Sequence, residues 1–484
     1  MAKSLSDFFT YRYRYQIGYG FIIIAFITLL TLAGLYVPGG LSEGEMKSFV
    51  RTAILDTENS VTFAIPNMPF YAMQRFSMDI LGPSTFAFKL PALICAFITG
   101  IGAVLLLRRW FRPNIAVLAT IIMITTGQFL YVAQSGAASI TFILWSVWLL
   151  LSATMITTSE RHKNFWKILF FIIMSLSLYT PLSIYLVIAI CSAGLLHPHV
   201  RYVLKKMSRQ HLALLTLLSV IIVAPLCYLI YINPSLSLQL LGAPLPSTGE
   251  WPPDILENLK ILLQQYLNFI SPQSGVLMTP FFGLGSIALV LIGIWQLFKI
   301  RYTARSYTLT AWIVLLIPIL VINPTYTSIT FVPLLLLLAS GLSYLLKSWY
   351  SMFPRNPYAR FVGVVPLTIL VGGLVVTGIG RYFDGYRYDP ETASSFNRDL
   401  TLFNKQVRGK YSPTLFVEKS EKPFYDAIAS YGGAYHKIIV TTAKPTKGDF
   451  VATKAAHNRI DIFPTRIITT DISKDSDRFY VYKN

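Results

Sequence analysis

Eleven apolar runs occupy most of the first 380 of the 484 residues, and a membrane-spanning helix needs about 20 such residues in succession. The pattern therefore predicts an all-α polytopic membrane protein with about 11 transmembrane helices. The runs lie at roughly 17–37, 86–107, 113–133, 138–157, 165–180, 181–196, 211–232, 276–298, 308–322, 329–346 and 361–380. One helix over residues 165–196 would be about 48 Å long against a hydrocarbon core of about 30 Å. We therefore expect a hairpin that turns at Tyr179-Thr180-Pro181.

Composition agrees with a membrane protein. The mean hydropathy is +0.56, and 13% of the residues are charged where a soluble protein has about 25%. The pI near 9.7 would suit nucleic-acid binding, but the Lys and Arg residues form small groups between apolar runs. That spacing is typical of membrane-flanking anchors and differs from the continuous basic stripe of a nucleic-acid site. We expect a lipid bilayer, and no nucleic acid, as the partner of this surface.

Lys and Arg alternate between two sets of gaps. One set holds nineteen bases and two acids, whereas the opposite set, up to residue 380, holds five bases and eight acids. The positive-inside rule then predicts a cytoplasmic N-terminus, external loops at about 38–85 and 233–275, and an external tail. No small-residue cleavage site follows the first run, so it is predicted to be an uncleaved signal anchor in the plasma membrane.

Both external loops contain helical patterns. Gly44–Leu55 and Phe70–Leu81 have the 3–4 spacing of amphipathic helices, and we expect both to lie in the membrane interface. In the second loop, Asp254 is expected to cap a short helix that runs to about Phe269. This segment would be either a lid over a lipid-facing cavity or a purely structural loop.

The tail after residue 380 has a different composition, with seventeen Lys and Arg, twelve Asp and Glu, and no spanning run. Pro423–Ser430 predicts a helix, and five short stretches predict strands. We therefore expect two domains, a transmembrane domain at 1–380 and a small extracytoplasmic α/β domain at 381–484 with an accessory or acceptor-recognition role. The predicted strands are Thr414–Glu418, Lys437–Thr442, Phe450–Ala455, Ile467–Thr470 and Arg478–Tyr482.

Acidic residues are concentrated in the two external loops. Carboxylates beside a bilayer are costly, so this clustering indicates a functional site. Eight of the ten acids in the first 380 residues lie there: Glu43, Glu45, Asp56, Glu58, Asp79, Glu250, Asp254 and Glu257. The three cysteines fall within apolar runs and offer neither metal spacing nor a disulfide framework. A divalent metal is possible, but the sequence does not indicate a metal site or any other cofactor.

Four short segments follow one another in an informative order. They are Gly40-Leu41-Ser42-Glu43-Gly44-Glu45-Met46, Ile65-Pro66-Asn67-Met68-Pro69-Phe70-Tyr71, Leu81-Gly82-Pro83-Ser84, and Phe88-Lys89-Leu90-Pro91-Ala92. This order resembles the polytopic GT-C glycosyltransferases, in the protein O-mannosyltransferase and aminoarabinose-transferase branch. The resemblance implies transfer of a sugar from a polyprenyl-phosphate donor to an extracytoplasmic acceptor, which could be a cell-envelope glycan, a lipid or a protein.

The resemblance also implies site residues. Glu43 and Glu45 fall where the family has its acidic pair, although either Ser42 or Glu43 takes the place of the first acid. Asn67 stands at a family Lys and Lys89 at a family Arg. The turn at Gln134-Ser135-Gly136-Ala137 lacks the Arg and Asp that the family often has there.

One of the two glutamates is predicted to be the general base, with its pKa raised by an apolar wall. The resemblance favours Glu43, because it aligns best with the family's acidic pair. The substrate-binding residues are predicted to be Arg51, Asn67, Arg75 and Lys89. Among the cations, Arg75 is preferred for the donor phosphate because an Arg fork suits phosphate geometry.

Structural alternatives stay open for five of these six residues. The two glutamates could be solvated acids near a helix N-terminus, Arg75 and Lys89 could be interfacial anchors, and Arg51 could solvate the loop helix.

Rival functions make different demands on the sequence. A transporter would be expected to carry ionisable groups at mid-membrane depth, but no apolar run has an Asp or Glu near its centre. A lipid-linked-glycan ligase or polymerase would carry bases in its large external loop, whereas 233–275 holds only Lys260. A receptor or assembly protein is a third alternative.

Overall fold

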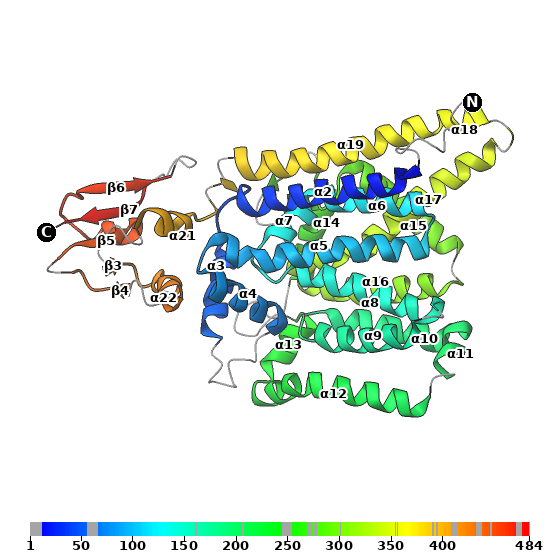
Figure 1. The fold of residues 1–484 in the computed structure, drawn as a ribbon, viewed down its shortest axis with the longest axis horizontal. Helices are drawn as coiled ribbons and strands as arrows, with labels where there is room; N and C mark the ends of the chain where they lie inside the picture. Colours follow the sequence, from blue (N-terminus) through cyan, green and yellow to red (C-terminus); the bar gives the residue numbers. More distant parts are fainter. Residues whose placement is uncertain are drawn as a thin grey trace.

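A bundle of long helices carries a small α/β domain at one end, and the two parts lie end to end (Figure 1). We call the end of the bundle that faces this domain the domain end, and the opposite end, where Arg109, Lys163 and Lys347 lie, the basic end. The computed structural model describes residues 12–55, 66–159, 162–205, 208–243, 254–269, 273–274, 278–300, 302–353, 355, 357–389, 392–393, 395–407, 414–431, 438–445, 448–470 and 477–483.

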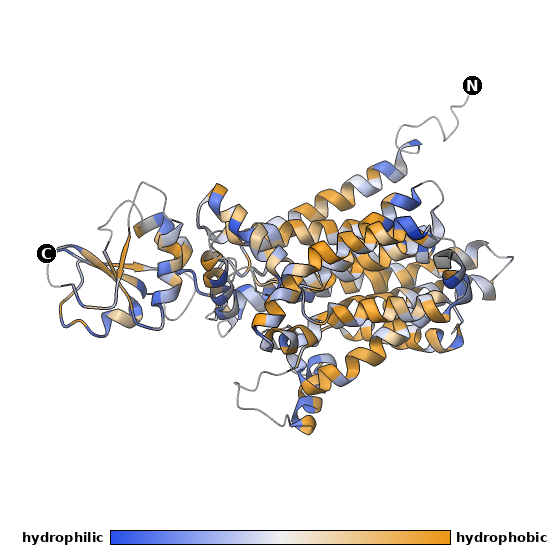
Figure 2. Ribbon diagram, turned by 90° about the horizontal axis from the view of Figure 1, so that it is seen from below, coloured by the Kyte–Doolittle hydropathy of each residue, from blue (hydrophilic) through white to orange (hydrophobic). Residues whose placement is uncertain are grey.

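Every predicted apolar run contains a helix, and apolar residues dominate the bundle in Figure 2. The bundle helices are α2 (Arg14–Leu35), α5 (Thr85–Trp110), α6 (Pro113–Thr125), α7 (Gly127–Gln134), α8 (Ile140–Thr158), α9 (Lys163–Ser177), α10 (Ser183–Leu196), α12 (Arg209–Ile232), α15 (Leu284–Lys299), α16 (Ala304–Ile322), α17 (Phe331–Met352) and α19 (Val364–Phe383). Among the described residues, seven helices are long and apolar enough to cross a membrane, or eight if α6 and α7, bent by 63°, form one span. The predicted count of eleven spans is therefore not confirmed.

The predicted break within residues 165–196 is confirmed. Helix α9 ends at Ser177 and α10 begins at Ser183, with Leu182 in the left-handed conformation (φ 64°) between them. The backbone N–H of Leu182 donates to the carbonyl of Leu240 at 2.8 Å, which fixes the turn against α13 (Ser235–Leu241). This turn consequently forms part of the domain end.

Helices α15 and α17 are in backbone contact. A Cβ on Gly293 would lie 2.0 Å from the carbonyl oxygen of Leu337, and one on Gly341 would lie 2.0 Å from that of Leu289. Only glycine fits at such separations, and small residues at helix contacts are a common means of packing within membranes.

Both predicted loop-one helices form, as α3 (Glu43–Ile54) and α4 (Met68–Leu81). Helix α4 exposes an apolar face with Met73, Phe76 and Ile80, as expected of an interfacial helix. The apolar face of α3 instead packs against protein. Phe49 is fully buried, with ring centroids 5.2 Å from Phe88 and 5.5 Å from Phe424 of the α/β domain. The interfacial location predicted for α3 is therefore wrong, because the α/β domain covers that face.

The α/β domain contains all five predicted strands and the predicted helix. The sheet order is β4-β3-β5-β7-β6, with β4, β3 and β5 parallel and β7 antiparallel to both β5 and β6. The elements are β3 (Thr414–Phe416), α22 (Lys422–Ser430), β4 (Ile439–Thr441), β5 (Phe450–Thr453), α23 (Lys454–His457), β6 (Arg466–Thr469) and β7 (Asp477–Tyr482). Helix α22 connects two parallel strands and packs on α3, so the βαβ unit joins the domain to the bundle.

Shorter elements complete the chain. They are α11 (Pro198–Lys205), α14 (Ile255–Leu267), the antiparallel pair β1 (Gln273–Ser274) and β2 (Met278–Thr279), η3 (Pro324–Thr330), α18 (Pro357–Val362), η4 (Asp384–Tyr388), α21 (Asp399–Leu402) and η5 (Phe403–Val407). The predicted second-loop helix is confirmed as α14, and the Asp254 carboxylate caps it by accepting from the N–H groups of Leu256 and Glu257.

A buried ion pair joins α3 to the bundle. The side chains of Glu45 and Lys89 are both 0% exposed, with Lys89 Nζ 3.5 Å from Glu45 Oε1. Lys89 Nζ also donates to the carbonyl of Gly40 at 2.8 Å and to Gln134 Oε1 at 2.6 Å. Buried charges of this kind need a partner and further hydrogen bonds, and the pair has both.

The same carboxylate holds two backbone segments. Glu45 Oε1 accepts from the N–H of Gly136 at 2.6 Å, and Oε2 accepts from the N–H of Ser42 at 2.8 Å, which completes a capping box at the start of α3. A Cβ on Gly136 would lie 1.9 Å from the Phe88 ring, so this turn between α7 and α8 requires glycine. Glu45 thus positions α3, and with it the wall of the site described below.

Replacing Lys89 with Met should destabilise the fold strongly, by about 3–5 kcal/mol, because the Glu45 charge would be left buried without its partner. The unfolding temperature in detergent measures this effect. The Glu45→Gln/Lys89→Met double variant should recover part of the loss, since no buried charge remains and Gln keeps an acceptor for Gly136. The control is Lys47→Met, which removes only an exposed ion pair with Glu43. Equal unfolding temperatures for Lys89→Met and Lys47→Met would contradict the structural role of the pair.

Candidate active site

A cavity of about 980 Å³ opens at the domain end between α3 and α14. Segments far apart in the sequence form its walls: the ends of α3 and α16 and the starts of α4, α8, α14 and η3. We call it the α3–α14 cavity. Its polar lining residues are Arg51, Asn67, Tyr71, Ser139, Gln239, Asp254, Glu257, Asn258, Asn323, Thr325 and Tyr326.

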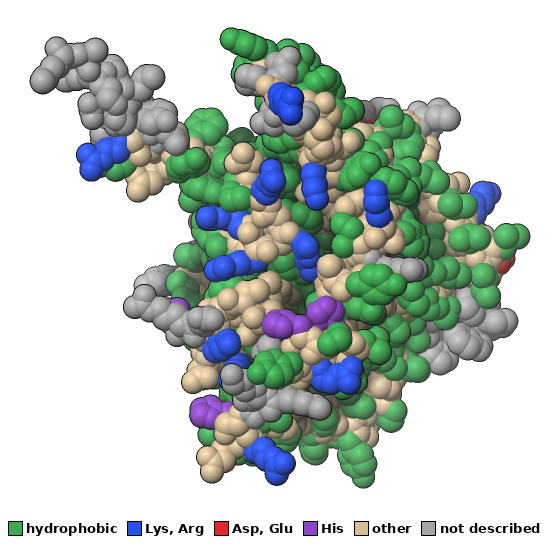
Figure 3. All heavy atoms as spheres, turned by 90° about the vertical axis from the view of Figure 1, so that its right-hand side faces the viewer, with side chains coloured by type: hydrophobic (Ala, Val, Ile, Leu, Met, Phe, Trp, Pro, Cys, Tyr) green, Lys and Arg blue, Asp and Glu red, His purple; other side chains and the backbone are tan. Residues whose placement is uncertain are grey.

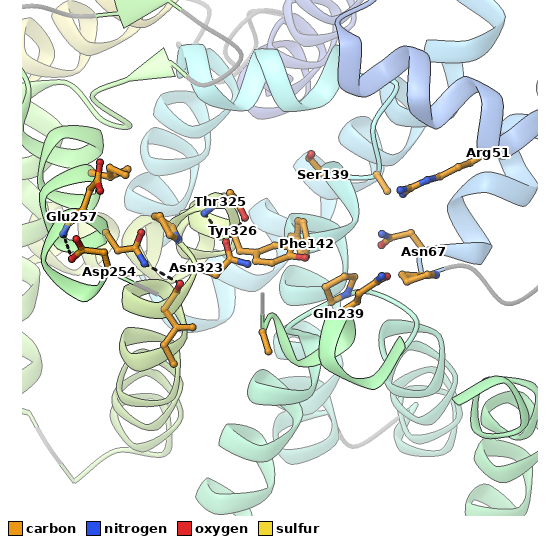
Figure 4. Close-up of a pocket in the computed structure, with 18 of the residues that line it drawn as sticks. Arg51, Asn67, Ser139, Phe142, Gln239, Asp254, Glu257, Asn323, Thr325 and Tyr326 are labelled. Carbon is orange, nitrogen blue, oxygen red and sulfur yellow. Dashed lines mark hydrogen bonds between the residues drawn. The ribbon is translucent and has the colours of Figure 1, made fainter. Parts of the chain in front are cut away.

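Charges of opposite sign face each other across this cavity. Figure 4 shows Arg51 entering from one side and Asp254 and Glu257 from the other, with Phe142 and Tyr326 between them. The side chains of Arg51 and Glu257 are exposed, and neither makes a hydrogen bond or ion pair within the part of the chain that the structure describes. Both ends of the cavity therefore hold a charge that is available to a ligand.

Asparagine side chains fix the walls. Asn258 Nδ2 donates to the carbonyl of Ile322 at 3.0 Å, which holds α14 against the end of α16. Asn323 Nδ2 donates to the carbonyl of Gly242 at 3.3 Å, and its Oδ1 accepts from the N–H of Thr325 at the start of η3. These contacts place the first turn of α14, including Glu257, on the rim opposite Arg51.

Asn67 is a rigid part of the opposite wall. It adopts the left-handed conformation (φ 65°), which Asn tolerates better than most residues. Its N–H donates to the carbonyl of Tyr179 at 2.7 Å, and its Oδ1 accepts from the Thr141 hydroxyl at 3.2 Å. Its side-chain amide N–H groups make no hydrogen bond to any described residue, which leaves them able to donate into the cavity.

Of the six predicted site residues, Arg51 and Asn67 line the α3–α14 cavity, whereas Glu43, Glu45, Arg75 and Lys89 do not. Glu45 and Lys89 form the buried pair. Arg75 Nη1 donates to the carbonyl of Ala53 at 2.7 Å, and its guanidinium also lies over the Tyr431 ring. The structure thus places Arg75 between the loop helices and the α/β domain.

Glu43 is an exposed residue at the start of α3. It forms an ion pair with Lys47 at 2.7 Å, and the hydrogen bond and charge of Lys47 lower the pKa of the Glu43 carboxyl. The raised pKa predicted for Glu43 is therefore wrong, because a cation one helical turn away stabilises the ionised form. Its role as a base stays a prediction.

Sequence reasoning located Glu257 in an acidic loop but assigned it no role. Its position one turn into a capped helix was visible, yet nothing in the sequence indicated that this helix faces Arg51, about 200 residues earlier. Asn323 and Tyr326 gave no signal at all, since they lie in a short gap between two apolar runs. In the described part of the chain, no group of three or more His, Cys, Asp or Glu side chains could hold a metal ion.

Comparisons with known proteins agree with this architecture. The family model for dolichyl-phosphate-mannose-protein mannosyltransferases matches residues 66–228, from the loop before α4 to within α12. No curated protein matches the sequence.

Similar folds occur among solved structures. The crystal structure of ArnT from Cupriavidus metallidurans bound to undecaprenyl phosphate has a TM-score of 0.56 at 12% identity and covers 96% of this chain and 98% of that one. The crystal structure of the same protein in the apo state has a TM-score of 0.53 at 13% identity, with the same coverage. The crystal structure of an oligosaccharyltransferase from Archaeoglobus fulgidus, in complex with zinc and sulfate, is a weaker match, with a TM-score of 0.48 at 10% identity. The match covers 89% of this chain and 68% of the oligosaccharyltransferase chain. The family-model match thus covers residues 66–228 only, and the matches to ArnT show that the chain has an ArnT-like fold over nearly its whole length.

Proposed function

We propose that this protein transfers a sugar from a polyprenyl-phosphate-linked donor to an acceptor, and that transfer takes place in the α3–α14 cavity. The observation that carries the proposal is the pair of opposed, available charges, Arg51 and Glu257, in a cavity at one end of a membrane bundle. The ArnT structure with the same fold was solved with undecaprenyl phosphate bound, which supports a polyprenyl phosphate as the lipid.

Arg51 is suited to the donor phosphate. The bond from the sugar to the phosphate breaks during transfer, and negative charge develops on the departing polyprenyl phosphate. The Arg51 guanidinium makes no hydrogen bond or ion pair with a described residue, so it can stabilise that charge with two parallel hydrogen bonds. The free amide N–H groups of Asn67, on the same side of the cavity, are able to donate to the phosphate or the sugar.

The lipid tail needs an apolar surface next to this head-group site. Helix α14 exposes Leu256, Leu259 and Leu263, and α4 exposes Phe76 and Ile80 on the other flank. These faces suit acyl or polyprenyl chains at the membrane boundary. The donor would then lie with its tail in the bilayer and its phosphate at Arg51.

Glu257 is suited to accept the acceptor's proton. In the proposed step, the acceptor oxygen forms a bond to the sugar carbon while the bond from that carbon to the phosphate oxygen breaks. The acceptor proton passes to the Glu257 carboxylate, and the phosphate leaves with the bonding electrons. We prefer Glu257 to Glu43 because it lines the cavity across from Arg51, although a base on α3 remains the rival assignment.

The charges at the two ends of the bundle support one orientation in the membrane. Most bases that flank the predicted spans belong to gaps at the basic end, so we propose that this end faces the cytoplasm and that the cavity and the α/β domain face outward.

Arg51→Ala should weaken binding of undecaprenyl phosphate by about 10–100-fold, the range expected when one charge-assisted hydrogen-bond donor is lost. Native mass spectrometry of the purified protein titrated with this lipid would measure the change. Lys260→Ala is the matched control, because it removes an exposed cation from α14 that does not line the cavity. If both variants bound the lipid like the unmodified protein, Arg51 would not be the phosphate ligand.

Glu257→Gln should lower the transfer rate by about 10²–10⁴-fold, since Gln keeps the shape but cannot take up the proton. The assay follows label from the polyprenyl-phosphate-linked sugars of host membranes into the acceptor fraction. Lipid binding should be unchanged, which separates this role from that of Arg51. Glu43→Gln is the informative comparison: full activity is expected, whereas loss of transfer in Glu43→Gln with full activity in Glu257→Gln would assign the base to α3.

A further inference from the structure

A second cavity, of about 460 Å³, lies at the basic end between α15, α16 and α17 and the α5–α6 turn. Three cations from three separate segments line it: Arg112 before α6, Arg305 in the first turn of α16 and Lys347 near the end of α17. None of the described residues that line it is an Asp or Glu. Figure 3 shows this end of the molecule, where Lys and Arg side chains gather and acidic side chains are nearly absent.

Two of these cations are available to a ligand. Arg112 and Lys347 are exposed, and neither forms a hydrogen bond or ion pair through its side chain with any described residue. Arg305 is held in place, because its Nη1 donates to the Trp110 carbonyl and its guanidinium lies 5.8 Å from the centroid of the Phe111 ring. The cavity therefore combines one fixed cation with two free ones.

The uncharged lining suits an amphiphile with a polar head. Gln296 Oε1 is buried and accepts no hydrogen bond from the described residues, so it is an open acceptor for a hydroxyl group. The hydroxyls of Ser340 and Ser343 also line the cavity and make no described hydrogen bond. Leu336 supplies a buried apolar wall deeper in the bundle.

We propose that this cavity binds the phosphate of an anionic phospholipid whose head group also carries a hydroxyl. A cluster of cations without acids attracts phosphate, and basic pockets between helices at a membrane surface bind anionic lipid head groups. A lipid is favoured over a free phosphate ion because apolar residues form the inner wall. The site is separate from the α3–α14 cavity, which lies at the other end of the bundle, and it does not depend on the proposed transfer reaction.

Native mass spectrometry of the whole protein can test the site, with phosphatidylglycerol as the probe and phosphatidylcholine as the zwitterionic reference. The unmodified protein should bind phosphatidylglycerol more tightly. Arg112→Ala/Lys347→Ala should weaken that binding about 30-fold, from the attraction that two cations supply near a membrane surface. Arg305 is left unchanged because it also holds the α5 end.

The matched control, Arg109→Ala/Lys163→Ala, removes the same charge from exposed positions of the same end that do not line the cavity. It should bind phosphatidylglycerol like the unmodified protein. A neutral variant, Ser343→Leu, should also weaken binding because it fills the cavity without changing the charge.

Equal losses in the two double variants would overturn the proposal, since the lipid would then respond only to the diffuse charge of the basic end. Inorganic phosphate distinguishes the two possible sources of the anion. No displacement of the lipid by millimolar phosphate is expected. Displacement with the same dependence on Arg112 and Lys347 would show a site for the free ion and would overturn the lipid assignment.

Discussion

The Glu45–Lys89 pair is the interaction on which the rest of the domain end depends. Both side chains are fully buried, and their remaining hydrogen-bonding groups reach Gly40, Ser42, Gln134 and Gly136. The pair thus fixes the start of α3 and the turn into α8 through Glu45, and the end of α7 through Lys89. A buried pair of this kind contributes less to net stability than to the choice of one arrangement, because breaking it leaves a charge without a partner.

That arrangement has a consequence for chemistry. Helix α3 begins at the buried pair and ends two turns beyond it, where Arg51 enters the α3–α14 cavity. A second, independent set of contacts, from Asn258 and Asn323, fixes the first turn of α14 on the opposite rim. Rigid support from both sides keeps Arg51 and Glu257 apart, so that Arg51 remains available to the donor phosphate and Glu257 to the acceptor hydroxyl.

Local patterns predicted local structure well. The apolar runs, the two loop-one helices, the Asp254 cap and the five strands all appear where the sequence indicated, because each depends on spacing within a few residues. The exposed state of Glu43 was also open to prediction, since Lys47 stands one helical turn away. The cavity could not be predicted from the sequence, because its two charged rims come from loops about 200 residues apart. The burial of Lys89 was missed for a similar reason: a lone Lys at the start of an apolar run is typical of an interfacial anchor, and only the fold brings Glu45 to it.

A density map of the protein in lipid nanodiscs with undecaprenyl phosphate would test the central claim most directly. The account predicts head-group density inside the α3–α14 cavity, with phosphate oxygens within hydrogen-bond distance of the Arg51 guanidinium and the side of the phosphate that bears the sugar facing Glu257. Phosphate density outside this cavity, for example beside Glu43 and Lys47 on the exposed side of α3, would contradict it.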